Sequence, residues 1–479
     1  MTNGSDRKTS HDPGSRDAGV PSLSVDAVII GGGIAGLWTL WALRRAGLAA
    51  LLVERTALGD GQTIGSQGII HGGVKYALTG SASRASLAIA AMPQRWADAL
   101  SPRDLSTRRD DPAIATPDLS DVRVLSRSQL LWTTTGTLSR LAGLAASKAL
   151  RTPVRALAVG SRPDAFVDAP SNVGVYEVDE TVIDPASLMA SLARAAQRAG
   201  GTDEHSIVPA LLMGNAQIIA DGPLQVAITS PGGGDRLTLA ARAVVMCAGE
   251  GNAPMLAALG LASRAPSQVR PLHMVMARAA KLPMIFGHCI AGSLSDKPRI
   301  TITSQRDDAG RVVWNIGGLP AERGVSMSPA DLIAHVRDEL RACLPWVDLT
   351  QAEFATTRWV RAEGLTADGT RPDEPVITRV PVAGGEVIAA WPTKLAFAPL
   401  VADKVLAMHA DLPRAAAASE SMVSPDLSSW PVPRPAVLPW LDQNVRWTAP
   451  THRAADLRAS RAPCLRQAVR RRVWWATPR

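Results

Sequence analysis

Near the start of the chain stands the stretch Val25-Asp26-Ala27-Val28-Ile29-Ile30-Gly31-Gly32-Gly33-Ile34-Ala35-Gly36. Its first half is short, apolar and rich in β-branched residues, which predicts a buried strand. Residues 34–46 predict a helix that ends at Gly47. Residues 49–53 predict a second buried strand, which ends at Glu54. Strand, glycine turn, helix and strand in this order form one βαβ unit.

The glycine spacing within this unit indicates a dinucleotide site. Gly31 allows the tight turn, Gly33 lets a pyrophosphate approach the backbone, and Gly36 lets helix and strand pack closely. The first helical N–H groups, at Ile34 and Ala35, then face the phosphates. A glycine-rich turn without a ligand is the alternative, but the strand, the helix and the acid that follows agree with binding.

Glu54 lies 18 residues after Gly36, where an acidic residue grips a ribose hydroxyl and disfavours a 2′-phosphate. Arg55 follows it directly. A simple NAD-dependent dehydrogenase would continue with further βαβ units. This chain continues instead with a polar, glycine-rich stretch at residues 59–76, which holds Gln62, Gln67, Gly68, His71 and Gly72.

This stretch resembles the flavin-side loop of FAD-dependent oxidoreductases of the D-amino-acid-oxidase superfamily. Its core, Ile70-His71-Gly72-Gly73, resembles the glycerol-3-phosphate dehydrogenase branch most closely, and the 2-hydroxyglutarate oxidases carry a related loop. Residues 182–188, 244–252, 361–364 and 391–395 are similar to later motifs of the superfamily, in the same order. Together the motifs span roughly residues 25–409.

The resemblance implies FAD as the cofactor. The residues expected to bind it are Gly31, Gly33, Ile34, Ala35, Gly36, Glu54, Arg55, Gln62, Gln67, Gly68, His71, Gly72, Cys247, Ala248, Gly249, Thr393, Lys394 and Leu395. In the superfamily, the helix start after residue 394 faces the pyrimidine end of the flavin. Lys394 would stabilise negative charge that develops there on reduction, although a surface lysine is the alternative.

Four residues are catalytic candidates: His71, His273, Arg361 and Lys394. His71 is expected beside the flavin, and a covalent bond to it is the less favoured form of this hypothesis, because some relatives attach flavin through a histidine in a comparable loop. Its alternative role is to hold the loop. His273 could act as a base or be a satisfied strand histidine, and Arg361 is a candidate clamp for a substrate anion. His288 is a further candidate on the substrate side.

The predicted fold class is α/β, a Rossmann-like FAD-binding domain with an antiparallel-sheet substrate domain of α+β type. We expect a disordered leader at residues 1–24 and a discontinuous FAD-binding domain at 25–85, 172–262 and 353–412. The substrate domain is expected at 86–171 and 263–352. An irregular tail rich in Pro, Trp and Arg is expected at residues 413–479. Its part at 425–440 is expected to lie across the body, and a recognition peptide is the alternative.

Charge and cysteine content narrow the classes of partner. The formal charge is +8, but residues 451–479 hold eight Arg and one Asp, so the rest of the chain is almost neutral. Nucleic acid is therefore not expected as a partner. The four cysteines form no CxxC pair, which argues against a metal site and for a reducing compartment, the cytoplasm. The leader contains no apolar stretch typical of a secretory signal.

The sequence thus predicts hydride transfer from a small hydroxy acid or polyol phosphate to flavin N5, with electrons passed on to oxygen or a quinone. An amine or amino-acid oxidase of the same superfamily is the alternative. A third hypothesis is a flavin-binding or membrane-associated interaction protein. In that case Arg470, Arg471 and Arg472, with Trp474 and Trp475, would make peripheral contact with the inner face of a membrane.

Overall fold

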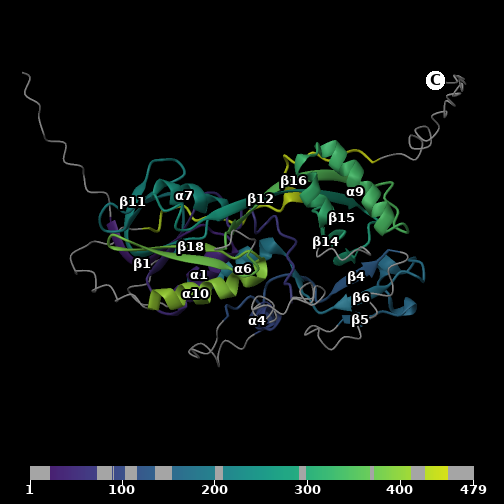
Figure 1. Cartoon of the computed structure of the whole chain (residues 1–479), viewed down its shortest axis with the longest axis horizontal. Helices are drawn as coiled ribbons and strands as arrows, with labels where there is room; N and C mark the ends of the chain where they lie inside the picture. The colour runs from purple at the N-terminus through teal and green to yellow at the C-terminus, as the bar shows by residue number, and fades with distance from the viewer. Residues whose placement is uncertain are drawn as a thin grey trace, which may run out of the picture.

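The computed structural model describes residues 22–72, 89, 91–102, 116–134, 154–199, 209–290, 298–366, 372–410 and 427–450 of the 479-residue chain. Most of the expected leader, the glycine-rich stretch from Gly73 onward, a helix expected at 138–150 and the basic segment 451–479 lie outside these residues. The described part contains two large sheets, which lie beside each other and are bridged by the long strands β12 and β16 (Figure 1).

The first sheet is parallel at its centre, as the βαβ pattern predicts. The strand order is β17-β18-β11-β1-β2-β8, with the hairpin β9-β10 attached to β11 and β17 antiparallel at the edge. The strands are β1 (Ser22–Ile30), β2 (Ala50–Glu54), β8 (Leu211–Met213), β9 (Asn215–Ile219), β10 (Gln225–Thr229), β11 (Arg236–Met246), β17 (Val376–Val382) and β18 (Gly385–Trp391).

Three helices cover one face of this sheet (Figure 1). They are α1 (Ile34–Arg45), α6 (Pro185–Arg198) and α10 (Ala398–Ala410). The predicted helices at 34–46 and 185–199 are confirmed, and Asp184 caps α6 by accepting hydrogen bonds from two backbone N–H groups. The helix expected from residue 395 begins as the 3₁₀ turn η5 (Leu395–Phe397). The remaining elements beside this sheet are α4 (Met92–Leu100), β3 (Val124–Ser126), β7 (Val182–Ile183), η3 (Gly249–Gly251) and α7 (Asn252–Ala258).

The second sheet is antiparallel except where β13 pairs with β4. Its order is β16-β12-β15-β14-β13-β4-β6-β5. The strands are β4 (Gln129–Thr133), β5 (Val154–Ala156), β6 (Val175–Val178), β12 (Ser267–Ala279), β13 (Gly287–Ile290), β14 (Ile300–Arg306), β15 (Val312–Gly317) and β16 (Glu353–Gly364). The helix α9 (Pro329–Cys343) packs against it, and α8 (Leu319–Arg323) and the short turns η1 (Val159–Ser161), η2 (Asp164–Phe166) and η4 (Gly324–Ser326) lie around it.

Two details correct the sequence-based expectations. The sequence of residues 122–135 has strand character and predicts one strand there. The structure divides it into β3 and β4, because the backbone bends at residues 127–128, where the Ser126 hydroxyl donates to the Ser128 carbonyl. In addition, β6 and β16 pair into the second sheet, although the expected boundaries assign both to the FAD-binding domain. The division into domains otherwise stays a prediction.

Residues 427–450, which we call the strap, lie across both sheets. Trp430 donates to the Met213 carbonyl beside the first sheet, and Leu58 forms backbone hydrogen bonds with Arg434 and Ala436. At its far end, Thr448 bonds to the backbone of Phe354 in β16. Its regular structure is the 3₁₀ turn η6 (Pro439–Leu441) and one β-bridge, which agrees with its many prolines.

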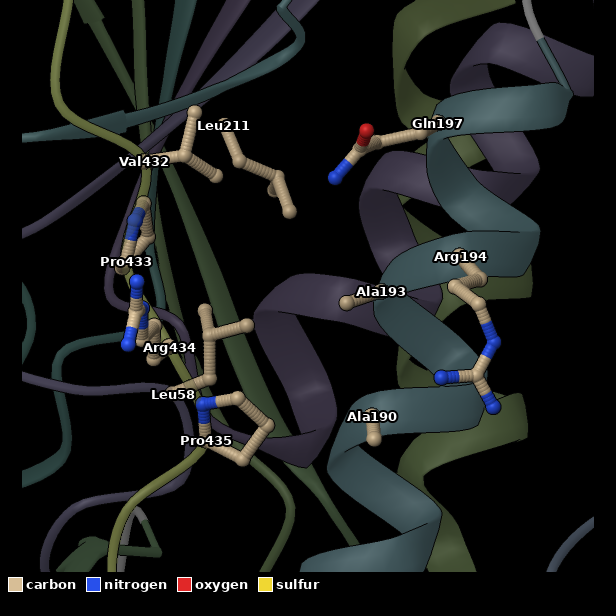
Figure 2. A pocket seen from close by; sticks show the side chains of 10 residues that line it. All are labelled: Leu58, Ala190, Ala193, Arg194, Gln197, Leu211, Val432, Pro433, Arg434 and Pro435. Atoms are coloured by element: carbon tan, nitrogen blue, oxygen red, sulfur yellow. The ribbon is translucent and has the colours of Figure 1, made fainter.

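The strap leaves a cavity of about 460 Å³ where it passes over α6 (Figure 2). Ala190 and Ala193 of α6, Leu211 of β8 and residues 432–435 of the strap line it. The strap is therefore attached here through its backbone at Leu58 rather than by close side-chain packing. No helix in the described part of the chain is long and apolar enough to cross a membrane.

Candidate functional site

The three glycines of the turn after β1 differ in the atoms that an added Cβ would contact. Gly31 has φ 110°, and an added Cβ would lie 2.6 Å from the Cys247 carbonyl carbon. At Gly36 an added Cβ would lie 1.9 Å from the Gly31 oxygen. At Gly33 it would meet only the Thr63 hydroxyl, at 3.3 Å. Packing therefore requires Gly31 and Gly36, whereas Gly33 keeps a surface bare that a ligand can approach.

The N-terminus of α1 opens onto this bare surface. Gly33 is the N-cap residue and offers no side chain, and the first turn contains no acidic residue. The Ile34 N–H donates to the Thr63 hydroxyl at 3.2 Å. The partial positive charge of the helix end is thus not neutralised by a side-chain carboxylate, which fits a pyrophosphate beside Ile34 and Ala35.

Glu54 ends β2 beside the same turn. Its Oε2 accepts from the Gly32 N–H at 2.6 Å, and its Oε1 accepts from the Thr56 N–H at 2.9 Å. A carboxylate has about four lone-pair sites, so a ribose hydroxyl can still donate to it. Arg55 is exposed. The donor and acceptor set around the turn therefore fits the dinucleotide part of FAD.

The glycine-rich loop is attached to the second sheet through its glutamines. Gln62 Oε1 accepts from the Ala362 N–H at 3.1 Å, and Gln67 Nε2 donates to the carbonyls of Thr301 and Asn315 at 3.2 and 2.9 Å. The structure thus uses both side-chain amides to join loop and sheet. Their expected contacts with the cofactor stay predictions.

The loop after β11 carries Cys247, Ala248 and Gly249. Burial raises the pKa of the Cys247 thiol to about 12, so the thiol is neutral and serves as a small apolar side chain. Asn252 holds the loop by accepting from the Ala248 N–H at 2.9 Å. Gly249 adopts φ 60°, in the left-handed region that favours glycine. Any contact of this loop with the cofactor would therefore come from its backbone.

The segment after β18 contains a strained residue. Thr393 has φ 59°, the one positive φ outside glycine in the described parts of the chain. Its hydroxyl and the Lys394 N–H both donate to the Pro392 carbonyl at 2.6 Å. The Lys394 ammonium lies 5.3 Å from the centre of the Phe397 ring. The turn into Leu395 is thus held in one conformation, while the electrostatic role of Lys394 stays a prediction.

His71 belongs to a polar cluster that we call the histidine–glutamate cluster, made of His71, Glu180 and His288. Glu180 Oε2 lies 3.3 Å from His71 Nδ1, and Oε1 accepts from the Gly72 N–H at 2.7 Å. The His71 and His288 rings are stacked with centres 6.2 Å apart. The structure therefore joins the glycine-rich loop to β13 of the second sheet at this point.

The other catalytic candidates contact different partners. His273 is buried, and its Nδ1 lies 2.9 Å from the Gly324 carbonyl. Burial lowers the pKa of His273, and Arg358 lowers it further, against the hydrogen bond that the ring donates to the Gly324 carbonyl. Arg361 donates to Glu322 at 3.0 Å. These contacts favour structural roles for both side chains, and a catalytic role for His71 stays a prediction.

Sequence reasoning missed Glu180, the buried acid of this cluster. Glu180 precedes residues 182–188, the segment that is similar to a superfamily motif. Its neighbour Asp179 is also acidic, so residue type does not distinguish the two. The neighbouring motif therefore marks the region and does not identify the residue. Gln129, which donates to Glu180 Oε2 at 3.2 Å, was also missed, because its contact with Glu180 depends on the pairing of two distant strands.

A family model described as FAD dependent oxidoreductase (DAO) matches residues 26–405. The chain belongs to this family. FAD is accordingly its cofactor and oxidation–reduction its type of reaction, as the sequence predicted. Membership also confirms the resemblance to the D-amino-acid-oxidase superfamily. The match does not resolve whether the chain belongs to the branch of the glycerol-3-phosphate dehydrogenases and 2-hydroxyglutarate oxidases.

One relative is similar over most of the chain. The probable FAD-dependent oxidoreductase PA4991 of Pseudomonas aeruginosa is 40% identical over 388 residues, 81% of this chain and 91% of that protein. The crystal structure of PA4991 matches with a TM-score of 0.66 and 34% identity, covering 88% of this chain and 98% of the other.

Two more distant structures share the fold of this family member. Glycine oxidase from Geobacillus kaustophilus has a TM-score of 0.54 at 18% identity, with 82% of this chain and 96% of the other covered. L-alpha-glycerophosphate oxidase from Mycoplasma pneumoniae, with FAD bound, has a TM-score of 0.52 at 13% identity, with 81% and 95% covered. One acts on an amino acid by its name and one on a polyol phosphate, so the shared fold does not select a substrate.

Proposed function

We propose that the protein oxidises a small hydroxy acid or a polyol phosphate at the carbon that bears the hydroxyl group. When bound, FAD supplies the acceptor for the hydride, and oxygen or a quinone receives the electrons afterwards. His71 removes the hydroxyl proton as the hydride leaves. The observation that carries the proposal is the buried carboxylate behind His71, whose Nδ1 lies 3.3 Å from Glu180.

The two substrate classes differ in whether their oxidation requires a base. An alcohol is a very weak acid, so its proton has to be taken while the hydride departs. An ammonium group is a much stronger acid than an alcohol, so a fraction of it loses its proton to water before the hydride leaves, and the neutral amine then needs no base. A histidine supported by a carboxylate therefore favours a hydroxyl substrate, although the amine or amino-acid oxidase remains the second candidate.

The test is the visible spectrum of the purified full chain under anaerobic conditions. We expect the flavin colour to bleach on mixing with 2-hydroxy acids or glycerol 3-phosphate, and not with amino acids. His71→Ala should slow bleaching by roughly 10²–10⁴-fold. His335→Ala is the matched control, since His335 lies on α9 beside the second sheet. Bleaching by amino acids alone would overturn the proposal in favour of the second candidate.

Acid precipitation of the same sample tests covalent attachment. Colour that stays in the precipitate would indicate a bond from the protein to the flavin, with His71 as the first residue to examine. Cytoplasmic location and peripheral membrane contact through residues 451–479 stay predictions, and binding of the full chain to anionic vesicles would support the interaction-protein hypothesis.

A further inference from the structure

Glu180 lies in the turn between β6 and β7, directly beside the loop that carries His71. Loop and turn are joined by two backbone hydrogen bonds: the Ile70 N–H donates to the Thr181 carbonyl at 2.9 Å, and the Ile183 N–H donates to the Gly68 carbonyl at 2.9 Å. Together these two bonds form the antiparallel bridge between Ile69 and Val182. The backbone itself thus sets the distance between the carboxylate and the imidazole.

The Glu180 carboxylate is almost fully buried and surrounded by donors. Its side chain is 6% exposed, whereas that of His71 is 40% exposed. Gly72 N–H donates to one oxygen, and Gln129 Nε2 donates to the other at 3.2 Å. Burial raises the pKa of Glu180, but the hydrogen bond from His71, the charges of His71 and His288 and the Gly72 N–H together hold it below its ordinary value. Glu180 is therefore an acceptor toward His71.

An acceptor at this position decides which nitrogen of His71 carries hydrogen. A buried carboxylate requires a donor, so the hydrogen of neutral His71 lies on Nδ1 and points at Glu180. Nε2 then has no hydrogen and is the atom that can accept a proton. Because His71 is the more exposed partner, this nitrogen is the one a substrate can reach.

We infer that Glu180 is a positioning residue, which holds His71 in the Nδ1–H form and so makes Nε2 the proton acceptor for the substrate hydroxyl. The inference rests on the proposed function. As the hydroxyl gives its proton to Nε2, its O–H electron pair forms the new carbonyl bond and the hydride leaves the same carbon. The negative Glu180 carboxylate then stabilises the imidazolium that results.

His288 is the third member of the cluster, and its presence raises the alternative of a metal site. The ligand atoms of His71, Glu180 and His288 lie within 4.8 Å of one another. Ligands about 2.0–2.2 Å from a tetrahedral zinc ion would lie only roughly 3.5 Å apart. His288 Nδ1 is 2.8 Å from the Thr301 hydroxyl, and Gln129 already donates to Glu180 Oε2. These bonds favour the positioning role over a metal.

The experiment reads the histidine tautomer directly in the FAD-bound full chain labelled with ¹⁵N-histidine. The His71 signals, assigned by their loss in His71→Ala, should have the shifts of the Nδ1–H form. In Glu180→Gln, an amide N–H replaces the acceptor, and we expect the hydrogen to move to Nε2. Glu177→Gln is the matched control, because Glu177 bonds to Ser128 and Arg155 instead and should leave the signals unchanged.

The second readout is the rate of flavin bleaching by the hydroxy substrate. Glu180→Gln should lower it by roughly 10²–10⁴-fold with little change in KM, whereas Glu177→Gln should not. The wild-type tautomer is informative even if Glu180→Gln fails to fold, because an Nε2–H form in the wild type would overturn the inference. Loss of both His71 and His288 signals on adding one equivalent of zinc would overturn it in favour of a metal site.

The two experiments distinguish a failure of the inference about Glu180 from a failure of the proposed substrate class. If amino acids reduce the flavin but His71 is in the Nδ1–H form, the substrate proposal is wrong while Glu180 still orients the imidazole. If hydroxy acids reduce the flavin and Glu180→Gln changes neither tautomer nor rate, the inference is wrong while the proposed function stands.

Discussion

Gly33 and Gly36 lie three residues apart in the same turn, yet a methyl group would have different effects at the two positions. Gly36 faces the Gly31 carbonyl, so an added Cβ would force α1 away from β1. Gly33 has φ −75° and ψ −177°, a conformation that alanine adopts readily. The second glycine therefore serves the packing of strand and helix, whereas at the first we expect contact with the cofactor.

We therefore expect Gly33→Ala to weaken FAD binding while changing the free energy of unfolding of the apoprotein by less than about 1 kcal/mol. Gly36→Ala should destabilise the apoprotein by about 1–3 kcal/mol or more through overpacking, and lose FAD as well. Thermal unfolding of the apoprotein and FAD titration measure the two effects. Gly232→Ala, where an added Cβ meets nothing within 4 Å, is the control for both. Equal destabilisation at Gly33 and Gly36 would contradict this division of roles.

For single residues, the sequence was informative where a residue's role depends on its type and on its spacing from a nearby motif. The glycines and Glu54 could be selected because each has a fixed distance from a recognisable turn, and His71 because the loop that contains it resembles a motif of the superfamily. Glu180 could not, because its importance depends on a backbone pairing between residues 68–70 and 181–183, more than a hundred residues apart along the chain.

Among the elements, the junction of β11, β18 and α7 depends on one side chain. Asn252 begins α7 and is completely buried. Its Nδ2 donates to the carbonyls of Met246 and Ala390 at 3.1 and 3.2 Å, and its Oδ1 accepts from Ala248. It therefore joins the carboxyl ends of two neighbouring parallel strands to the loop expected at the cofactor.

Asn252→Ala leaves these buried backbone groups with fewer partners, at about 1–3 kcal/mol for each one left unsatisfied. We expect a total loss of about 2–4 kcal/mol and, for a chain of this length, a Tm lower by roughly 2–5 °C. Differential scanning calorimetry measures the change. Asn444→Ala is the control, since Asn444 is exposed and bonds only to Asp442 within its own turn. A similar Tm for the two variants would show that Asn252 does not join these elements.

The elements themselves were predicted well where hydrophobic runs are bounded by turn residues, as at β1, α1, β2 and α6. Their sheet partners were predicted less well. β6 and β16 have apolar patterns that suit either sheet, and the choice depends on long-range pairing with β4 and β12. Such pairing leaves no local signature in the sequence.

In the molecule as a whole, the strap connects the two sheets from outside. It pairs with Leu58 beside the glycine turn, and its Leu438 and Trp440 pack with Ile64 of the glycine-rich loop and Met276 of β12. Arg278 of β12 lies over the Trp447 ring, 3.9 Å from its centre. The strap thus contacts both sheets and the loop between them.

We expect a chain that ends at residue 426 to melt at a lower temperature and to release FAD faster than the full chain. A chain that ends at residue 450 keeps every strap contact described here and is the control. Thermal unfolding and the rise of free-flavin fluorescence after dilution measure both properties. If the chain that ends at residue 450 loses activity while keeping FAD, residues 451–479 are needed for function. That result would support the interaction-protein hypothesis for this segment.

The order of strands in the first sheet also has a consequence for synthesis on the ribosome. β1 pairs with β11, whose residues follow about 200 positions later. The other edge of β11 pairs with β18, which is synthesised later still. β2 follows β1 closely and can cover one of its edges. At roughly 5–20 residues per second, the other edge of β1 stays open and apolar for about 10–40 s, until β11 is made. The nascent chain is then most exposed to aggregation before the cofactor has a site to enter. The yield of holoprotein should therefore depend on how well this open edge is protected from aggregation during synthesis.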